Sequence, residues 1–285
     1  MRNVLVTGGS GQLGSAIKSI KDHFKELNFF FKSSNELDVT SRSAIENILD
    51  ERQYDIIVNT AAYTAVDKAE SEYENAQKIN ATAVKYLAET AFNRGITLIH
   101  ISTDYVFDGI ESKARLETDQ TNPIGVYGQT KLEGEELALK ANPKTIIIRT
   151  SWVYSEFGSN FVKTMLRLFN EKKEISVIND QTGSPTNAND LAKVIGVIAS
   201  ANELVYGIFN YSNEGQCSWF EFANKIKDLV HSTIEIKPIS STQYVTAAKR
   251  PAYSLLNKGK IKDIYELEIP HWITSLEEAL GKMVK

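Results

Sequence analysis

The first 150 residues alternate between two patterns of apolar positions. Short apolar runs predict buried strands at about residues 4–6, 28–34, 55–59, 97–102 and 145–150. Segments with apolar residues at helical spacing lie between them and predict helices at about 13–24, 43–51, 75–93 and 124–139. Strands that alternate with helices in this way predict an α/β protein with a doubly wound parallel sheet.

Beyond residue 150 the predicted elements become shorter and more mixed. Helices are expected at 161–170, 190–201, 219–230 and 274–283, strands at 175–178 and 207–212, and loops at 151–155 and 180–186. We therefore expect a smaller, mixed α/β C-terminal lobe that binds the substrate. The predicted dinucleotide-binding domain covers 1–151 and about 187–213, and the substrate lobe covers about 152–186 and 214–285.

The composition is that of an ordinary globular protein. Of the 285 residues, 42% are hydrophobic and 24% are charged. The net charge of −4 argues against nucleic-acid binding. Cys217 is the only cysteine, which excludes an internal disulfide, and no apolar run approaches the ~20 residues of a membrane span. We therefore expect a cytoplasmic protein with neither a membrane nor a nucleic-acid partner.

A glycine-rich turn follows the first predicted strand. Gly8, Gly11 and Gly14 stand between this strand and a helix. In this context the first glycine permits a tight turn, the second lets the backbone approach a pyrophosphate, and the third allows close packing of the helix. The first amides of the helix would then face the phosphates. We predict a Rossmann-type dinucleotide site, although a purely structural turn fits the same glycines.

The end of the second predicted strand bears on the choice of cofactor. An acidic residue there would bind the adenosine 2′-hydroxyl and favour NAD. The chain instead has Lys32 followed by two serines, and a cation with two hydroxyls suits a 2′-phosphate. We therefore predict NADPH, with NADH as the alternative if Lys32 is merely a solvated lysine. Asp38 is a candidate to bind the adenine amino group, while a helix cap at Thr40 or Ser41 is an equally natural role for this stretch.

A hydroxyl, a phenol and an ammonium are predicted to meet at the end of the fourth strand. Thr103 ends this strand, and Tyr127 and Lys131 lie four residues apart on one face of the following helix. This combination suits carbonyl reduction, because the phenol gives a proton, the ammonium lowers its pKa and the Thr hydroxyl holds the substrate oxygen. About one Tyr-x-x-x-Lys is expected by chance, so the prediction also depends on the glycine turn.

Other polar residues are less decisive. Arg250 lies in a loop, where an anionic ligand and plain solvation explain it equally well. The four histidines are widely scattered, which favours surface or core positions over a metal site. The sequence has no Ser-His-Asp order with a nucleophile elbow, which argues against a hydrolase.

Four longer runs make the sequence similar to a known enzyme family. They lie at residues 61–70, 102–109, 149–154 and 177–186. Together with the glycine turn and the Tyr127–Lys131 pair, they resemble the extended short-chain dehydrogenase/reductase superfamily and, within it, the dTDP-4-dehydrorhamnose reductases. The resemblance covers nearly the whole chain and is weakest after about residue 215.

This resemblance implies reduction of the C4 ketone of dTDP-4-dehydro-L-rhamnose, with the smaller lobe binding the nucleotide-sugar. The implied catalytic residues are Thr103, Tyr127 and Lys131. Besides Lys32, the residues expected to line the cofactor are Gly8, Gly11, Gln12, Leu13, Asp38, Val39, Ala61, Ala62, Tyr63 and Lys131. Those implied to face the substrate are Val66, Asp104, Tyr105 and Trp152, with Arg250 near the diphosphate.

Departures from the pattern of related enzymes narrow the expected reaction. Related nucleotide-sugar dehydratases carry an Asp-Glu pair after the strand-end Thr, whereas Asp104 precedes Tyr105 here, so we expect reduction rather than elimination. Some family members are metal-assisted dimers with acidic residues early in the first helix. Ser15 and Ala16 offer none, so we expect no metal and either a monomer or a homodimer.

Two alternatives stay open. One is a reductase or epimerase of the same superfamily that acts on another nucleotide-sugar. The other is a non-catalytic NADP-binding regulatory subunit built on the same fold, against which the presence of all three catalytic residues argues.

Overall fold

The computed structural model describes residues 1–283 and contains a central sheet of six parallel strands. These are β1 (Arg2–Thr7), β2 (Leu27–Lys32), β3 (Ile56–Asn59), β4 (Thr97–Thr103), β5 (Thr145–Thr150) and β10 (Gly207–Asn210). Their order is β10-β5-β4-β3-β1-β2, and each neighbouring pair is parallel. The order reverses between β1 and β3, and ligands of doubly wound sheets bind in the crevice at such a point.

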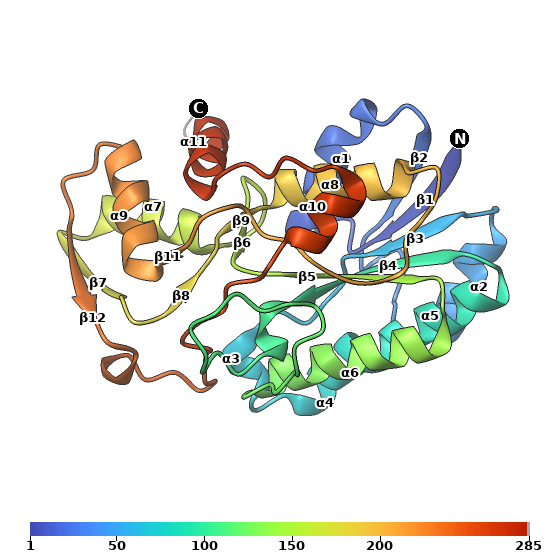
Figure 1. The fold of residues 1–285 in the computed structure, drawn as a ribbon, viewed down its shortest axis with the longest axis horizontal. Coiled ribbons are helices and arrows are strands. Elements are labelled where there is room, and N and C mark those ends of the chain that lie inside the picture. The colour runs from blue at the N-terminus through green and yellow to red at the C-terminus, as the bar shows by residue number, and fades with distance from the viewer. Residues whose placement is uncertain (284–285) are drawn as a thin grey trace.

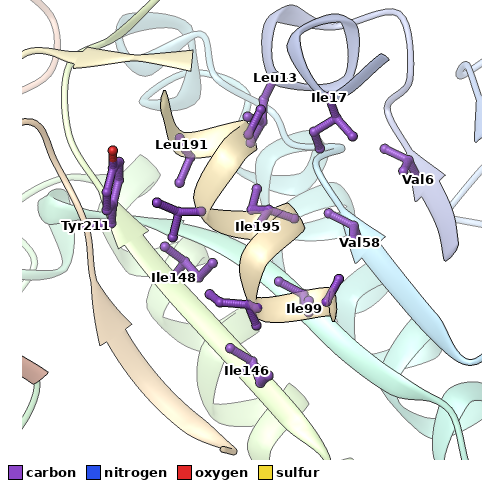
Figure 2. Close-up of a cluster of buried hydrophobic side chains, with 14 of the residues drawn as sticks. Val6, Leu13, Ile17, Val58, Ile99, Ile146, Ile148, Leu191, Ile195 and Tyr211 are labelled. Carbon is purple, nitrogen blue, oxygen red and sulfur yellow. The ribbon is translucent and has the colours of Figure 1, made fainter. Parts of the chain in front are cut away.

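Helices cover both faces of this sheet (Figure 1). One face carries α1 (Gln12–Ile20), α8 (Ala188–Ser200) and α10 (Gly259–Tyr265). The other carries α2 (Arg42–Asp50), α5 (Ala83–Asn93) and α6 (Val126–Ala141). Figure 2 shows Ile17 of α1 and Ile195 of α8 lying over Val58 and Ile148 of the sheet. Because the central strands are buried from both sides, each has a run of apolar residues at its centre.

A separate aromatic-rich cluster holds together the part of the chain that lies beyond the sheet (Figure 1). Its elements are α7 (Phe161–Glu171), α9 (Trp219–Leu229), α11 (Trp272–Met283), β7 (Glu174–Ile178) and β12 (Glu235–Ile239). Phe222 is fully buried at its centre, with ring centroids 5.5 Å from Tyr154 and 5.7 Å from Trp272. Two short strand pairs lead into it, namely β6 (Val153–Tyr154) with β9 (Thr186–Asn187), and β8 (Thr182–Gly183) with β11 (Cys217–Ser218).

The helical segment predicted at 75–93 is not a regular α-helix. It consists of α4 (Tyr73–Gln77), a π-helical segment η2 (Lys78–Thr82) and α5. The remaining short helices are α3 (Val66–Ala69), η1 (Lys21–His23), η3 (Asp104–Val106) and η4 (Ser241–Gln243). Short π segments of this kind are frequent near functional sites.

The prediction of a doubly wound parallel sheet with a smaller mixed lobe is confirmed. The loops predicted at 151–155 and 180–186 contain the short strands β6, β8 and β9, and β12 and α10 were not predicted. In β12 only Ile236 is buried, so the sequence of this strand has no apolar pattern from which it could be predicted. The proposed domain boundaries stay a prediction. None of the helices within residues 1–283 combines the length and the apolar character needed to span a membrane.

Candidate active site

The carboxyl ends of β1, β3 and β4 lie side by side at one edge of the sheet. Thr7 ends β1 in register with Asn59 at the end of β3, and Asn59 is in register with His100 of β4. The glycine turn and Ala61 lie in the segments that leave β1 and β3, and Thr103 is the last residue of β4. The register therefore brings the predicted cofactor and catalytic residues to one edge.

The glycine turn is as tight as its sequence predicts. Gly8 has a φ of 65°, and a Cβ there would lie 2.8 Å from the backbone nitrogen of Ala61. A Cβ on Gly14 would lie 2.7 Å from the Cα of Gly9. Gly11 is the N-cap of α1, and no side chain caps the first amides of this helix. These amides are therefore free to bind an anion.

Gln12 and Leu13, at the start of α1, have different environments. Gln12 Oε1 accepts hydrogen bonds from the hydroxyl of Ser155 at 3.1 Å and the amide of Asn160 at 2.9 Å, which ties the turn to the second lobe. Leu13 is 8% exposed and belongs to the core cluster, so its backbone rather than its side chain is available to a ligand.

The end of β2 places Lys32 beside the glycine turn. Gly9 donates its N–H to the carbonyl oxygen of Lys32 at 2.9 Å, and the Lys32 ammonium lies 3.9 Å from Glu51. Glu36 accepts from both the backbone N–H and the hydroxyl of Ser33. A 2′-phosphate at this position would compete with Glu36 for these two donors, which sequence reasoning did not foresee.

Asp38 and Val39 lie in the next loop. The Asp38 carboxylate accepts from the N–H and the hydroxyl of Thr40, and these bonds lower its pKa. Val39 is 9% exposed and packs in the core. Ser41 caps α2 by accepting from the Ala44 N–H, so the predicted helix cap is present beside the candidate adenine contact.

The segment after β3 is held by the π-helical segment. The Asn80 side chain accepts from the Tyr63 N–H at 2.9 Å and donates to the Tyr63 carbonyl at 3.1 Å. The same amide donates to Thr130 of α6 at 3.2 Å. Ala61 and Ala62 lie between this anchor and the strand end. Asn80 is therefore a positioning residue that the sequence alone did not single out.

The three predicted catalytic residues lie on β4 and α6. Thr103 ends β4, and Tyr127 and Lys131 follow on the helix that packs against the same strand. The Thr103 hydroxyl donates to Asp104 Oδ1 at 3.0 Å and accepts from the Tyr105 N–H at 3.2 Å. Lys131 is 1% exposed and donates to the carbonyl oxygen of Ile101 at 2.6 Å.

Burial dominates the protonation of these groups. It raises the pKa of Tyr127 to about 12, against a lowering by the nearby Thr103 hydroxyl. It lowers the pKa of Lys131 to about 8, against the charge of Glu135, which raises it. It also raises the pKa of Asp104 to about 6. The expected lowering of the Tyr127 pKa by Lys131 is not among the causes of its shift, and burial keeps the phenol protonated.

Two residues beneath Lys131 were not identified from the sequence. His100 is fully buried, and its Nε2 lies 3.2 Å from Lys131 Nζ. Glu135, one turn further along α6, forms a two-point ion pair with Arg149 of β5, with a shortest distance of 2.6 Å. The sequence predicts a surface or core position for His100, and its position is in the core. For Glu135, the only signal in the sequence is its helical spacing of four residues from Lys131.

The residues predicted to face the substrate lie around the same edge. Val66 begins α3, and the rings of Tyr105 and Tyr127 meet edge to face with centroids 5.6 Å apart. Asp104 is 2% exposed, and its Oδ2 has no hydrogen-bond partner among the described residues. Trp152 has a φ of 48° and stacks on Trp219 with centroids 3.6 Å apart.

Arg250 is neither unpaired nor simply solvated. Its guanidinium donates to the two carboxylate oxygens of Asp67 at 3.2 and 2.7 Å, and Asp67 also accepts from the Ala248 N–H. This ion pair fastens the loop before Arg250 to α3. An anionic ligand would therefore meet an arginine that is already positioned by a carboxylate.

Within residues 1–283, no three His, Cys, Asp or Glu side chains lie close enough together to hold a metal ion.

The doubly wound sheet, the glycine turn and the Thr103–Tyr127–Lys131 group define a dinucleotide-binding α/β oxidoreductase. The particular family follows from comparison with known proteins. The chain belongs to the family described as the RmlD substrate binding domain, whose sequence profile matches residues 1–285. The predicted resemblance to the dTDP-4-dehydrorhamnose reductases and the predicted enzyme class are confirmed.

The similarity extends over the whole length of the relatives. A dTDP-4-dehydrorhamnose reductase from Aggregatibacter actinomycetemcomitans is 39% identical, with 97% of this chain and 98% of that protein aligned. The crystal structure of the reductase from Bacillus anthracis in complex with NADP has a TM-score of 0.95 at 37% identity, covering 99% of both chains. The orthologue from Clostridium acetobutylicum has a TM-score of 0.93 at 38% identity, covering 99% of this chain and 100% of that one.

Proposed function

We propose that this protein catalyses the NADPH-dependent reduction of the C4 ketone of dTDP-4-dehydro-L-rhamnose to dTDP-L-rhamnose. The observation that carries the proposal is the strand-end group of buried Thr103, buried Lys131 and partly buried Tyr127. It occurs in a chain 37–40% identical to proteins named dTDP-4-dehydrorhamnose reductase. The alternative of a regulatory subunit receives no support from this group, because a binding module needs no matched proton donor and amine.

In this proposal Tyr127 is the proton donor. Bound NADPH supplies the hydride that reduces the carbonyl carbon. The raised pKa of Tyr127 keeps the phenol protonated, so that it can give its proton to the oxygen as negative charge develops there. The Thr103 hydroxyl, which now donates to Asp104, would turn its proton toward the same oxygen. Lys131 binds the nicotinamide ribose and, when protonated, stabilises the phenolate that remains.

The cofactor site follows the glycine turn. Gly8, Gly11 and the amides of Gln12 and Leu13 face the pyrophosphate, and Ala61, Ala62 and Tyr63 line the crevice beside it. Asp38 and Val39 flank the adenine. Lys32 and the Ser33 donors hold the 2′-phosphate and thereby favour NADPH over NADH, and the NADP complex of the Bacillus anthracis relative supports this preference. No metal is required for these steps.

The smaller lobe is proposed to bind the nucleotide-sugar. Val66, Asp104, Tyr105 and Trp152 face the sugar, and Arg250 meets the diphosphate. Residues 152–186 and 214–285 form this lobe, and residues 1–151 with 187–213 form the dinucleotide-binding domain. The enzyme acts as a monomer or a homodimer. Mutation of the Arg250–Asp67 pair would affect substrate rather than cofactor affinity.

The test is oxidation of the reduced cofactor, followed by its absorbance. The protein is mixed with NADPH and dTDP-4-dehydro-L-rhamnose generated in situ, with a parallel reaction that contains NADH. We expect substrate-dependent oxidation, faster with NADPH, and dTDP-L-rhamnose as the product. NADPH binding without any oxidation would contradict the proposed substrate and reaction and favour another nucleotide-sugar or the regulatory subunit.

A further inference from the structure

A buried row of polar groups runs across the sheet beneath the proposed cofactor site. Asn59 Oδ1 lies 2.6 Å from the Thr7 hydroxyl and 3.2 Å from the Ala61 backbone nitrogen. Asn59 Nδ2 lies 3.0 Å from His100 Nδ1, and His100 Nε2 lies 3.2 Å from Lys131 Nζ. Apart from Ala61, each of these residues is no more than 1% exposed, so the donors and acceptors must match one another.

The orientation of the Asn59 amide is fixed by the backbone. The Ala61 N–H can only donate, so the Asn59 atom that faces it must be the carbonyl oxygen. The Thr7 hydroxyl donates to the same oxygen. The amide nitrogen of Asn59 consequently faces His100 and can only donate to it.

This orientation selects one tautomer of His100. Because Asn59 donates to Nδ1, this nitrogen must be unprotonated. Burial and the neighbouring Lys131 lower the pKa of His100 well below its usual value, so the ring is neutral and carries its proton on Nε2. His100 therefore presents an N–H, not a lone pair, to Lys131.

A protonated Lys131 does not fit such a neighbour. An ammonium has only donors, and it would face the Nε2–H at 3.2 Å. A neutral amine accepts from His100 and still donates to the Ile101 carbonyl at 2.6 Å. Glu135, the nearest carboxylate on the helix, is already paired with Arg149. Burial favours the same neutral form.

We infer that at mildly alkaline pH Asn59 and His100 hold Lys131 as a neutral amine, and that binding of the cofactor's ribose hydroxyls draws a proton from solvent onto it. The part of the inference that concerns proton uptake rests on the proposed function, because it requires that Lys131 contact the bound cofactor. It makes Asn59 and His100 positioning residues for the reduction. In the NADPH complex the new ammonium donates to ribose oxygens, and its charge stabilises the Tyr127 phenolate.

The balance of nearby charges is consistent with this assignment. The charged and titratable groups around Lys131 are His100 on β4, Asp104 after β4, Tyr127 and Glu135 on α6, and Arg149 on β5. Tyr127 and His100 are neutral, and Glu135 and Arg149 offset each other. Asp104 directs one oxygen to Thr103 rather than to Lys131.

The first test measures the tautomer of His100 in the free protein. Ring nitrogens are observed by ¹⁵N NMR after histidine labelling, and His100→Gln identifies the His100 signals among those of four histidines. We expect an unprotonated Nδ1 and a protonated Nε2 at pH 8.5. The opposite tautomer would overturn the inference, because Nε2 could then accept from an ammonium.

The second test measures proton uptake when NADPH binds. Calorimetric titrations at pH 8.5 in buffers of different ionisation enthalpy give the number of protons exchanged. We expect uptake of about half a proton or more, because binding raises the pKa of Lys131 through this pH. Uptake below roughly a tenth of a proton would overturn the inference.

Asn59→Asp keeps the shape of the side chain but replaces the donor that faces His100 with an acceptor. A carboxylate accepts from Ala61 and Thr7 and also from His100 Nδ1–H, which turns Nε2 into an acceptor for an ammonium. We expect the opposite tautomer and the loss of proton uptake, whereas Thr7→Val, which keeps the Ala61 contact, retains both wild-type results. Unchanged uptake in Asn59→Asp would count against the inference. Failure of the wild type to bind NADPH would overturn the proposed function and the cofactor-linked half, while the tautomer still decides the first half.

Discussion

The polar row beneath Lys131 and the aromatic cluster around Trp219 are both buried, but they restrict their side chains differently. In the polar row, each hydrogen bond has a donor and an acceptor, so one fixed amide determines the protonation of the next group. In the aromatic cluster, Trp219 stacks on Trp152 with planes 9° apart and contacts Phe161 at a centroid distance of 4.6 Å. These contacts depend on shape and tolerate small shifts.

This difference separates chemistry from recognition. The polar row lies along the sheet, whose register fixes its atoms, and we propose that it sets the protonation of the amine beside the proton donor. The aromatic cluster belongs to the second lobe and holds Trp152, which we propose to face the sugar. We therefore expect changes in the first region to act on kcat and on the state of protonation, and changes in the second region to act on KM.

The largest effect is expected for Tyr127→Phe. Removal of the phenol hydroxyl takes away the proposed proton donor, and general acids of this kind contribute roughly 10²- to 10⁴-fold. We expect a loss of kcat in this range with NADPH affinity unchanged, measured by steady-state kinetics and calorimetry. Turnover equal to the wild type would show that the proton comes from elsewhere. Tyr73→Phe, an exposed tyrosine on α4, is the matched control and should leave both values unchanged.

Glu135→Ala should act on stability. It leaves the Arg149 guanidinium, which is 2% exposed, without its carboxylate, and breaking a buried pair costs about 3–5 kcal/mol. Urea unfolding of Glu135→Ala and of Glu136→Ala, whose side chain is exposed on the same helix, compares the two positions directly. A loss below roughly 1 kcal/mol at Glu135 would mean that Arg149 finds another partner. The control should stay within about 0.5 kcal/mol of the wild type.

Trp219→Leu should affect the second region alone. The stacked pair is worth about 0.5–1.5 kcal/mol, so Trp152 becomes less well positioned and KM for the nucleotide-sugar rises by roughly two- to tenfold. We expect kcat to change by less than about twofold, because the polar row is untouched. Steady-state kinetics with Phe92→Leu, an exposed aromatic on α5, provides the control. A fall in kcat with constant KM would break the proposed separation of the two regions.

The smallest effect per substituted position is expected at the end of β2. Replacement of Lys32 and Ser33 by Glu and Asp removes the proposed 2′-phosphate contacts and should shift the preference toward NADH. An exposed ion contact is worth about 1 kcal/mol or less, so the ratio of the two Kd values should change by roughly fivefold per position. Calorimetry with both cofactors measures the ratio. An unchanged ratio, equal to that of Lys172→Glu at the residue after α7, would remove these residues from the cofactor site.

The sheet could be predicted from the sequence because its strands are buried on both faces. β4 and β5 are buried almost throughout and have apolar residues at their centres, and Gly8 and Gly14 show in the sequence that the turn after β1 is tight. β12 could not be predicted in this way, because it is an edge strand with one buried side chain and charged neighbours. The π-helical segment could not be predicted either, because over five residues its apolar spacing does not differ from that of an α-helix.

In the candidate site, too, some residues could be predicted from the sequence and others could not. Tyr127 and Lys131 are close in sequence, so helical spacing alone puts them on one face. The partners of Lys131 and Arg250 are distant in sequence: His100 lies on another element, and Asp67 is 183 residues away from Arg250. Such pairs depend on how elements assemble, and a single sequence carries no local signal for them.

The π-helical segment η2 has a consequence for insertions and deletions. A π turn carries one residue more than the α turn it replaces, because its hydrogen bonds span five residues instead of four. Deletion of one residue from 78–82 would leave a regular helix but rotate α4 by about 100° relative to α5. Asn80 would then lose its hold on Tyr63 and Thr130. In this short stretch a change of length would therefore undo the same contacts as a substitution of Asn80, with every side chain kept.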